Sequence, residues 1–216
     1  MSSTLTMIVP AGWRRVEAGP NQEASIREAV DAAYRDADRD SSAVAKHWMR
    51  ERLREALTAP EELDSEVVAV AYPERPAAGM MLPVSATVLR MSLSTNSVDD
   101  AMKALARMSA GEPDAHVQQT PVGLVLRSYS VRDVKQAFDV QVDGAPIQES
   151  EKLAIAAASE AMPSLRVRYV IPSTSGDSWY AVAFSAMLGS DEPELVGVYL
   201  ELFDAFVGSL EWRDTP

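Results

Sequence analysis

The spacing of hydrophobic residues changes several times along the chain, and each spacing predicts a different element. Between positions 23 and 57 apolar residues recur every three or four positions, with no glycine or proline, which is typical of amphipathic helix. In the middle, the segment from Asp40 to Ser42 supplies side chains that accept hydrogen bonds from the first turn of a following helix. We therefore predict two helices here rather than one long helix.

Alternating apolar and polar residues, or short apolar runs bounded by turn residues, predict strands. The expected strands are Thr4–Val9, Glu66–Tyr72, Val84–Ser94, His116–Gln119, Val122–Val131, Ala137–Val142, Leu165–Ile171 and Ser178–Leu188. Helical spacing returns in three further segments, and Ser97 with Asp100 resembles a capping box before the first of them. These segments are Val98–Met108, Glu149–Met162 and Glu192–Val207. The apolar face of the first would consist of Val98, Ala101, Met102, Leu105 and Met108.

The C-terminal block from Leu165 to Trp212 defines the expected fold. In its first strand Arg166 and Arg168 alternate with apolar residues, which indicates a strand with one wetter face. In the next strand, from Trp179 onward, both the odd-numbered and the even-numbered positions are mostly apolar. Both faces of this strand therefore need a covering layer. Together with the following helix, this pattern predicts an α+β fold: a largely antiparallel sheet flanked by helices on both faces, an α/β/α sandwich.

Three parts of the chain resemble the PsbP-like / Mog-type fold family, which includes actinobacterial lipoproteins and cytoplasmic relatives. The turn from Pro10 to Trp13 (Pro-Ala-Gly-Trp) is similar to the family's Pro-x-Gly-Trp, a strand–helix–strand order runs over 84–131, and the terminal hairpin and helix run over 166–212. The resemblance implies one domain over 1–216 with a helical insertion at about 22–58. It also implies a protein-binding or assembly role rather than catalysis, and no functional residue of the family is carried over.

The charge of the chain limits its partners. The formal net charge is −12, with 13 basic and 16 acidic residues in 1–108 and 7 basic and 16 acidic residues in 109–216. Such a protein lacks electrostatic attraction to nucleic acid or to anionic membranes. There is no cysteine, no signal-peptide pattern at the N-terminus and no apolar run long enough to span a bilayer. We expect a cytoplasmic protein that binds neither nucleic acid nor membrane.

The motifs of common enzymes and metal sites are absent from the sequence. It has no G-x-S-x-G elbow and no phosphate-binding glycine loop, and its only histidines are His47 and His116, the second expected to be a structural residue of a strand. The segment Asp36–Asp40 has the carboxylate spacing that begins a calcium loop, but Ser41 stands where glycine is required and His47 where a bidentate glutamate belongs. We therefore expect no cofactor, no metal and no enzymatic activity.

One stretch, Lys46–Arg54, has the composition of a partner-binding helix. Trp48 and Met49 lie beside Arg52, and tryptophan and arginine are enriched at interface hot spots. The alternative is that the apolar stripe packs on the protein's own sheet while the arginines face solvent.

Two classes of function follow. The first is a protein-binding or assembly factor, or a homo-oligomer, and an exposed apolar patch on Glu23–Leu57 would favour it. The second is a small-molecule binding protein or unrecognised enzyme with a pocket between sheet and helices. A pocket with converging polar groups would favour the second class.

Overall fold

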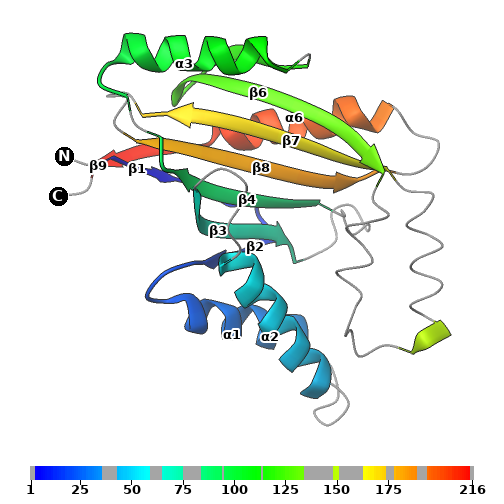
Figure 1. Ribbon diagram of the computed structural model, residues 1–216. Coiled ribbons are helices and arrows are strands. Elements are labelled where there is room, and N and C mark those ends of the chain that lie inside the picture. The colour runs from blue at the N-terminus through cyan, green and yellow to red at the C-terminus, as the bar shows by residue number, and fades with distance from the viewer. Residues whose placement is uncertain are drawn as a thin grey trace.

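The computed structural model describes residues 3–35, 43–58, 65–74, 84–93, 95–112, 114–133, 148–150, 163–173, 178–188 and 194–214. Within these ranges a seven-stranded antiparallel sheet has the strand order β2-β3-β4-β8-β7-β6-β5 (Figure 1). Its strands are β2 (Trp13–Glu17), β3 (Ser65–Pro73), β4 (Val84–Met91), β5 (His116–Thr120), β6 (Gly123–Asp133), β7 (Pro163–Pro172) and β8 (Trp179–Met187). A separate antiparallel ribbon pairs β1 (Ser3–Thr6) with β9 (Glu211–Asp214).

Helices cover both faces of the large sheet, as the pattern of β8 predicts. Helix α6 (Glu194–Gly208) lies behind the sheet in Figure 1, against β7 and β8. The other face carries α1 (Gln22–Ala33) and α2 (Ala43–Thr58) at its β2–β3 end and α3 (Val98–Ala110) at its β5–β6 end. The α+β architecture with helices on both faces is therefore confirmed.

The face under α6 holds the larger part of the apolar core. Phe203 is fully buried and stacks on Phe184 of β8, with ring centroids 4.3 Å apart and an interplanar angle of 13°. Phe206 meets the same ring edge-on at 5.2 Å. The buried residues of the helix are Tyr199, Phe203, Phe206 and Val207, followed by Leu210 just beyond it. This aromatic packing explains why the helical spacing of the C-terminal block is so regular.

A polar cluster also holds α6 to the sheet. The carboxylate of Asp204 accepts hydrogen bonds from the Tyr169 hydroxyl at 2.7 Å and from the Gln118 amide at 3.0 Å, and it forms an ion pair with Arg127. Tyr169 is completely buried, and burial, followed by its bond to Asp204, raises its pKa above the ordinary value. The cluster joins the helix to β5, β6 and β7 through a single acidic side chain.

On the opposite face the helices bury two separate apolar clusters. Under α1 and α2 these buried residues include Val16, Ile26, Val30, Leu57 and Leu89. Under α3 they include Leu105, Leu126, Val170 and Trp179. Because the clusters lie toward opposite ends of the sheet, the middle of this face is left without a helix among the described residues.

Several local predictions are confirmed. Two helices form in the segment 23–57, and the Asp100 amide donates to the Ser97 hydroxyl at 3.2 Å at the start of α3. The turn from Pro10 to Trp13 is closed by a 3.0 Å bond from the Trp13 amide to the Pro10 carbonyl. Gly12 has φ 83° in this turn, a conformation that other residues adopt with strain.

Other local predictions are wrong in part. β1 ends at Thr6 rather than Val9, and β4 ends at Met91 rather than Ser94. Val98 and Met102 are 54% and 39% exposed, because α3 lies over the edge of the sheet and buries only the narrow stripe that contains Ala101 and Leu105. The strands β2 and β9 do not appear among the elements expected from the sequence.

Some predictions fall on parts of the chain without a described structure. The Asp36–Asp40 segment, the proposed break at 40–42 and the strand Ala137–Val142 lie outside the described residues. Of the helix Glu149–Met162 only Glu149 and Ser150 are described.

Candidate functional site

Polar side chains occupy the uncovered middle of the sheet face that carries α1, α2 and α3. They form two adjacent rows across four strands, since residues paired directly across antiparallel strands point to the same side. The first row is Thr87, Ala183, Arg168 and Ser128, and the second is Ser85, Ser185, Arg166 and Ser130. We call these eight residues the polar trough.

The trough borders directly on the apolar core. The next row along the same four strands is buried and consists of Leu89, Ala181, Val170 and Leu126. The face therefore changes from apolar to polar within two residues along each strand. Packing of the core does not account for the polar residues in these two rows, most of which are part-exposed or exposed.

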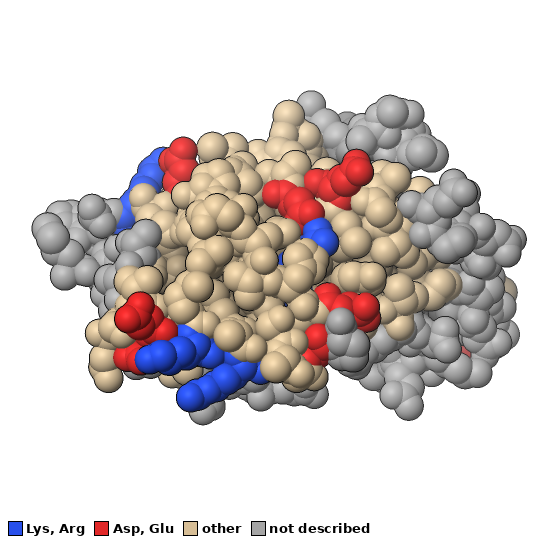
Figure 2. All heavy atoms as spheres, turned by 90° about the horizontal axis from the view of Figure 1, so that it is seen from above, with Lys and Arg blue, Asp and Glu red and all other residues tan. Residues whose placement is uncertain are grey.

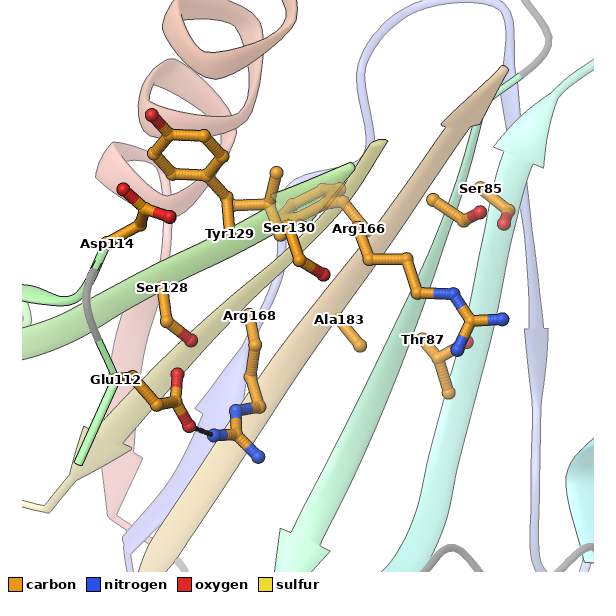
Figure 3. A pocket seen from close by; sticks show the side chains of 13 residues that line it. Ser85, Thr87, Glu112, Asp114, Ser128, Tyr129, Ser130, Arg166, Arg168 and Ala183 are labelled. Carbon is orange, nitrogen blue, oxygen red and sulfur yellow. Dashed lines mark hydrogen bonds and ion pairs between the residues drawn. The ribbon is translucent and has the colours of Figure 1, made fainter. Parts of the chain in front are cut away.

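The trough is the floor of a cavity of about 780 Å³, whose rim includes Glu112 and Asp114 (Figure 3). This volume lies within the range typical of small-molecule sites, about 300–1,000 Å³. Apart from the two arginines, the trough residues are serine, threonine and alanine, whose short side chains leave space above the sheet. Most such sites are lined by apolar groups, and this floor is unusual in being mainly polar.

The two arginines of the trough have different surroundings. Arg168 forms an ion pair with Glu112, drawn as a dashed line in Figure 3, and the two side chains are 34% and 38% exposed. Arg166 is exposed and has no ion-pair partner within the described ranges. In Figure 3 its guanidinium extends toward Ser85 and Thr87 on β4. The trough thus offers one cation that the protein's own described carboxylates do not neutralise.

Hydroxyl groups flank this cation. Ser130 and Ser185 are the direct cross-strand neighbours of Arg166. The guanidinium itself extends toward Ser85 and Thr87 (Figure 3), so one oxyanion above the sheet can contact the guanidinium and a hydroxyl on that side. Arginine binds carboxylates and phosphates through paired, charge-assisted hydrogen bonds. The arrangement is suited to an oxyanion.

The acidic side of the cavity is formed by the turn that follows α3. The Ala115 amide donates to the Glu112 carbonyl at 3.1 Å, and the Ser109 hydroxyl donates to the Ala115 carbonyl at 3.2 Å. These bonds fold the chain back toward β5 and hold Glu112 and Asp114 at the rim. The charged lining residues are therefore two carboxylates at the α3 side and two arginines over β7.

The described lining of the cavity combines hydroxyl, carboxylate and guanidinium groups. It contains serine and threonine hydroxyls but neither histidine nor cysteine. A hydroxyl without an adjacent base is a weak nucleophile. Within the described ranges, histidine and carboxylate side chains do not gather in threes that could hold a metal ion.

The residues expected from the sequence to contact a partner lie elsewhere, on α2. Trp48 is half-buried, and the Arg52 guanidinium lies over its ring at 5.8 Å. Arg52 also pairs with Glu55 at 2.8 Å. Met49 packs against the apolar cluster under α1 and α2. The structure brings Trp48 and Arg52 together and turns Met49 inward, and their part in partner binding stays a prediction.

The other basic residues of α2 join the two N-terminal helices. Arg50 pairs with Asp31 at 3.4 Å, and Arg54 pairs with Glu23 at 2.6 Å. The bond from Arg54 lowers the pKa of the Glu23 carboxyl. Arginines that bind α1 in this way are less available to another protein.

Neither of the two histidines is part of the described lining of the cavity. His47 is exposed on α2, and His116 is exposed on the edge strand β5. His116 lies in a strand, as the sequence predicts, and its side chain is exposed because β5 has only one neighbouring strand among the described residues.

Neither protein-family models nor curated proteins match the chain. The antiparallel sheet with helices on both faces agrees with the architecture that the PsbP-like resemblance implies, and membership of that family stays a prediction. None of the helices among the described residues combines the length and the apolar character that crossing a bilayer requires.

Proposed function

We propose that this protein is a non-enzymatic binding protein that holds a small molecule in the polar trough through a carboxylate or phosphate group. The observation that carries the proposal is Arg166, a cation without an ion-pair partner in the described structure, set between Ser130 and Ser185 on the floor of a cavity. A cavity with converging polar groups favours the small-molecule class of function over the protein-binding class.

The charge of the chain adds to this proposal a location for the protein and the classes of partner that it does not bind. We propose a cytoplasmic protein that binds neither nucleic acid nor membrane, supported by the net charge of −12. In Figure 2 the described basic side chains on the visible face lie beside acidic ones and form no continuous basic area. This distribution disfavours a polyanionic partner on that face.

The surface of α2 is the second candidate, as a contact site for another protein or a second copy of the chain. The stacked pair of Trp48 and Arg52 favours it, because tryptophan and arginine carry much of the binding energy at interfaces. The ion pairs of Arg50 and Arg54 with α1 limit this surface, so we rank it below the trough.

The test is titration with octanoate and with inorganic phosphate, followed by amide chemical shifts in NMR spectra, which detect weak binding. We expect at least one of these anions to shift the amide signals of Ser130 and Ser185. Arg166→Gln should lower the affinity by about tenfold or more, the usual effect of removing a charged hydrogen-bond donor. Arg107→Gln is the matched control, since Arg107 is an exposed arginine of α3 away from the cavity, and should leave the affinity unchanged.

A third variant, Trp48→Ala/Arg52→Ala, separates the two candidate sites. Anion binding that is lost in this variant and kept in Arg166→Gln would move the function to α2. No binding of either anion, or equal binding by Arg166→Gln and the parent, would contradict the proposal for the trough.

A further inference from the structure

We propose that the ligand of the polar trough is an extended zwitterion, with its anionic group at Arg166 and an ammonium group at Asp114. The inference rests on the proposed function of the trough and adds the charge and the length of the molecule that fits it. Three features support it. Two opposite charges without ion-pair partners in the described structure lie at different sides of the cavity, the distance between them suits an extended molecule, and the whole protein is strongly acidic.

Opposite charges lie at two sides of the cavity. Figure 3 shows Asp114, from the turn after α3, beyond β6, while the Arg166 guanidinium extends over β8 toward β4. Glu112 and Arg168, which also line the cavity, neutralise each other. Asp114 is exposed and, like Arg166, has no ion-pair partner in the parts of the chain that the structure describes. One negative and one positive group therefore remain for a ligand to pair.

The separation of these groups sets the length of the ligand. Neighbouring strands are about 4.8 Å apart. Asp114 lies beyond β6 and the Arg166 guanidinium extends over β8, so about three strand spacings, roughly 14 Å, separate the two groups. A charge-assisted hydrogen bond of about 2.8 Å at each end takes up part of this length, so the charges of the ligand should be about 9–10 Å apart. An extended chain of about eight bonds spans this distance. In an α-amino acid the two charges are too close together to reach both groups.

The charge of the whole protein favours a neutral molecule. A net charge of −12 repels an anion that approaches from solution, whereas a zwitterion without net charge is not repelled. The charged residues of the described lining are Glu112, Asp114, Arg166 and Arg168, so the lining itself is neutral. A zwitterion pairs both unpaired groups and keeps the site neutral, while a simple anion leaves Asp114 unpaired beside it.

The experiment compares octanoate with 8-aminooctanoate, which differ only in the terminal ammonium group, by NMR titration. We expect 8-aminooctanoate to bind about two- to fivefold tighter, the range for one exposed ion pair. In Asp114→Asn the two molecules should bind with equal affinity. Propanoate and 3-aminopropanoate form the short control pair, in which the ammonium group should bring no gain. Arg107→Gln should retain the full difference between the long probes.

The outcomes separate this inference from the proposed function. Octanoate binding that depends on Arg166, with no gain from the ammonium group or with a gain that persists in Asp114→Asn, would overturn the zwitterion and leave the trough as an oxyanion site. Failure of both long probes and of phosphate to bind would overturn the proposed function as well. Melting temperatures of both variants within about two degrees of the parent confirm that the substitutions leave the fold intact, as expected for exposed polar residues.

Discussion

Single side chains at the interface between α6 and the sheet show how polar groups are held within this core. Tyr169 is completely buried, yet its hydroxyl reaches Asp204 at 2.7 Å. Asp204 also binds Arg127, whose side chain is 15% exposed. Without Asp204, the Tyr169 hydroxyl and the Arg127 guanidinium would both lose the partner that they share. A buried polar group without a hydrogen bond costs about 1–3 kcal/mol.

The raised pKa of Tyr169 predicts a loss of stability in alkali. Above pH ~10 the tyrosine of the unfolded chain releases its proton, while the buried hydroxyl in the folded protein keeps it. Unfolding then releases a proton, so the free energy of unfolding falls as the pH rises above this value. Tyr169→Phe should make this decline shallower, measured as the urea midpoint between about pH 8 and pH 11.

The control for this prediction is Tyr34→Phe, a half-buried tyrosine of the N-terminal helices outside the Asp204 cluster. This variant should keep the full alkaline decline of the parent. Equal slopes for Tyr169→Phe and the parent would show that the Tyr169 proton does not contribute to the pH dependence.

At the scale of elements, α6 depends on aromatic packing. Phe203 is fully buried and stacks on Phe184, so Phe203→Ala leaves a cavity in the middle of the interface. We expect the free energy of unfolding to fall by about 3–5 kcal/mol, or the chain not to fold. Val198→Ala on the same helix, at a residue that is 60% exposed, should cost less than about 1 kcal/mol. A melting temperature for Phe203→Ala close to that of Val198→Ala would contradict this account of the packing.

Local patterns predict most of the elements but miss those whose partners lie far along the chain. The hairpins of β5 with β6 and of β7 with β8, the pair α1 and α2, and the start of α3 follow from spacing and turn residues. β2 has five residues and β9 has four, and each becomes a strand by pairing with a distant segment. Both runs, Trp-Arg-Arg-Val-Glu and Glu-Trp-Arg-Asp, are rich in charged residues and lack the apolar alternation that predicted β1.

Prediction of the candidate site is also limited by contacts between segments that are far apart in the sequence. The alternation around Arg166 and Arg168 correctly predicts a wetter face of β7. The hydroxyls beside them come from β4, β6 and β8, and which residues meet depends on strand register. A single sequence does not fix that register between β4, which ends at Met91, and β8, which begins only at Trp179. The trough could therefore not be predicted from the sequence.

At the scale of the whole molecule, the ribbon of β1 and β9 is joined to the main core by Trp212. Its ring meets that of Tyr180 at 5.7 Å, and its indole nitrogen donates to the Val122 carbonyl at 3.0 Å. Leu5, the partner of Trp212 in the ribbon, is buried in the same core. One tryptophan thus connects the first strand, the last strand and the large sheet.

Replacement of this tryptophan should destabilise the whole domain. Trp212→Ala removes both the ring contact and the hydrogen bond, and we expect a loss of about 2–4 kcal/mol in urea unfolding. Trp212→Phe keeps an aromatic ring and should lose about 1 kcal/mol, the value of the hydrogen bond. Arg213→Ala, at the exposed neighbour on the same strand, should change stability by less than about 0.5 kcal/mol. Equal stability of Trp212→Ala and Arg213→Ala would mean that the ribbon does not support the core.

The pairing of β1 with β9 also sets a waiting time during protein synthesis. Thr6 pairs with Glu211, so the ribosome must add about 200 residues after the first strand before its partner exists. At about 5–20 residues per second this takes roughly 10–40 s. During that interval Leu5 and Met7, which are buried in the finished protein, have no completed core to enter. The nascent chain therefore exposes an apolar N-terminal segment to chaperones until synthesis has passed β9.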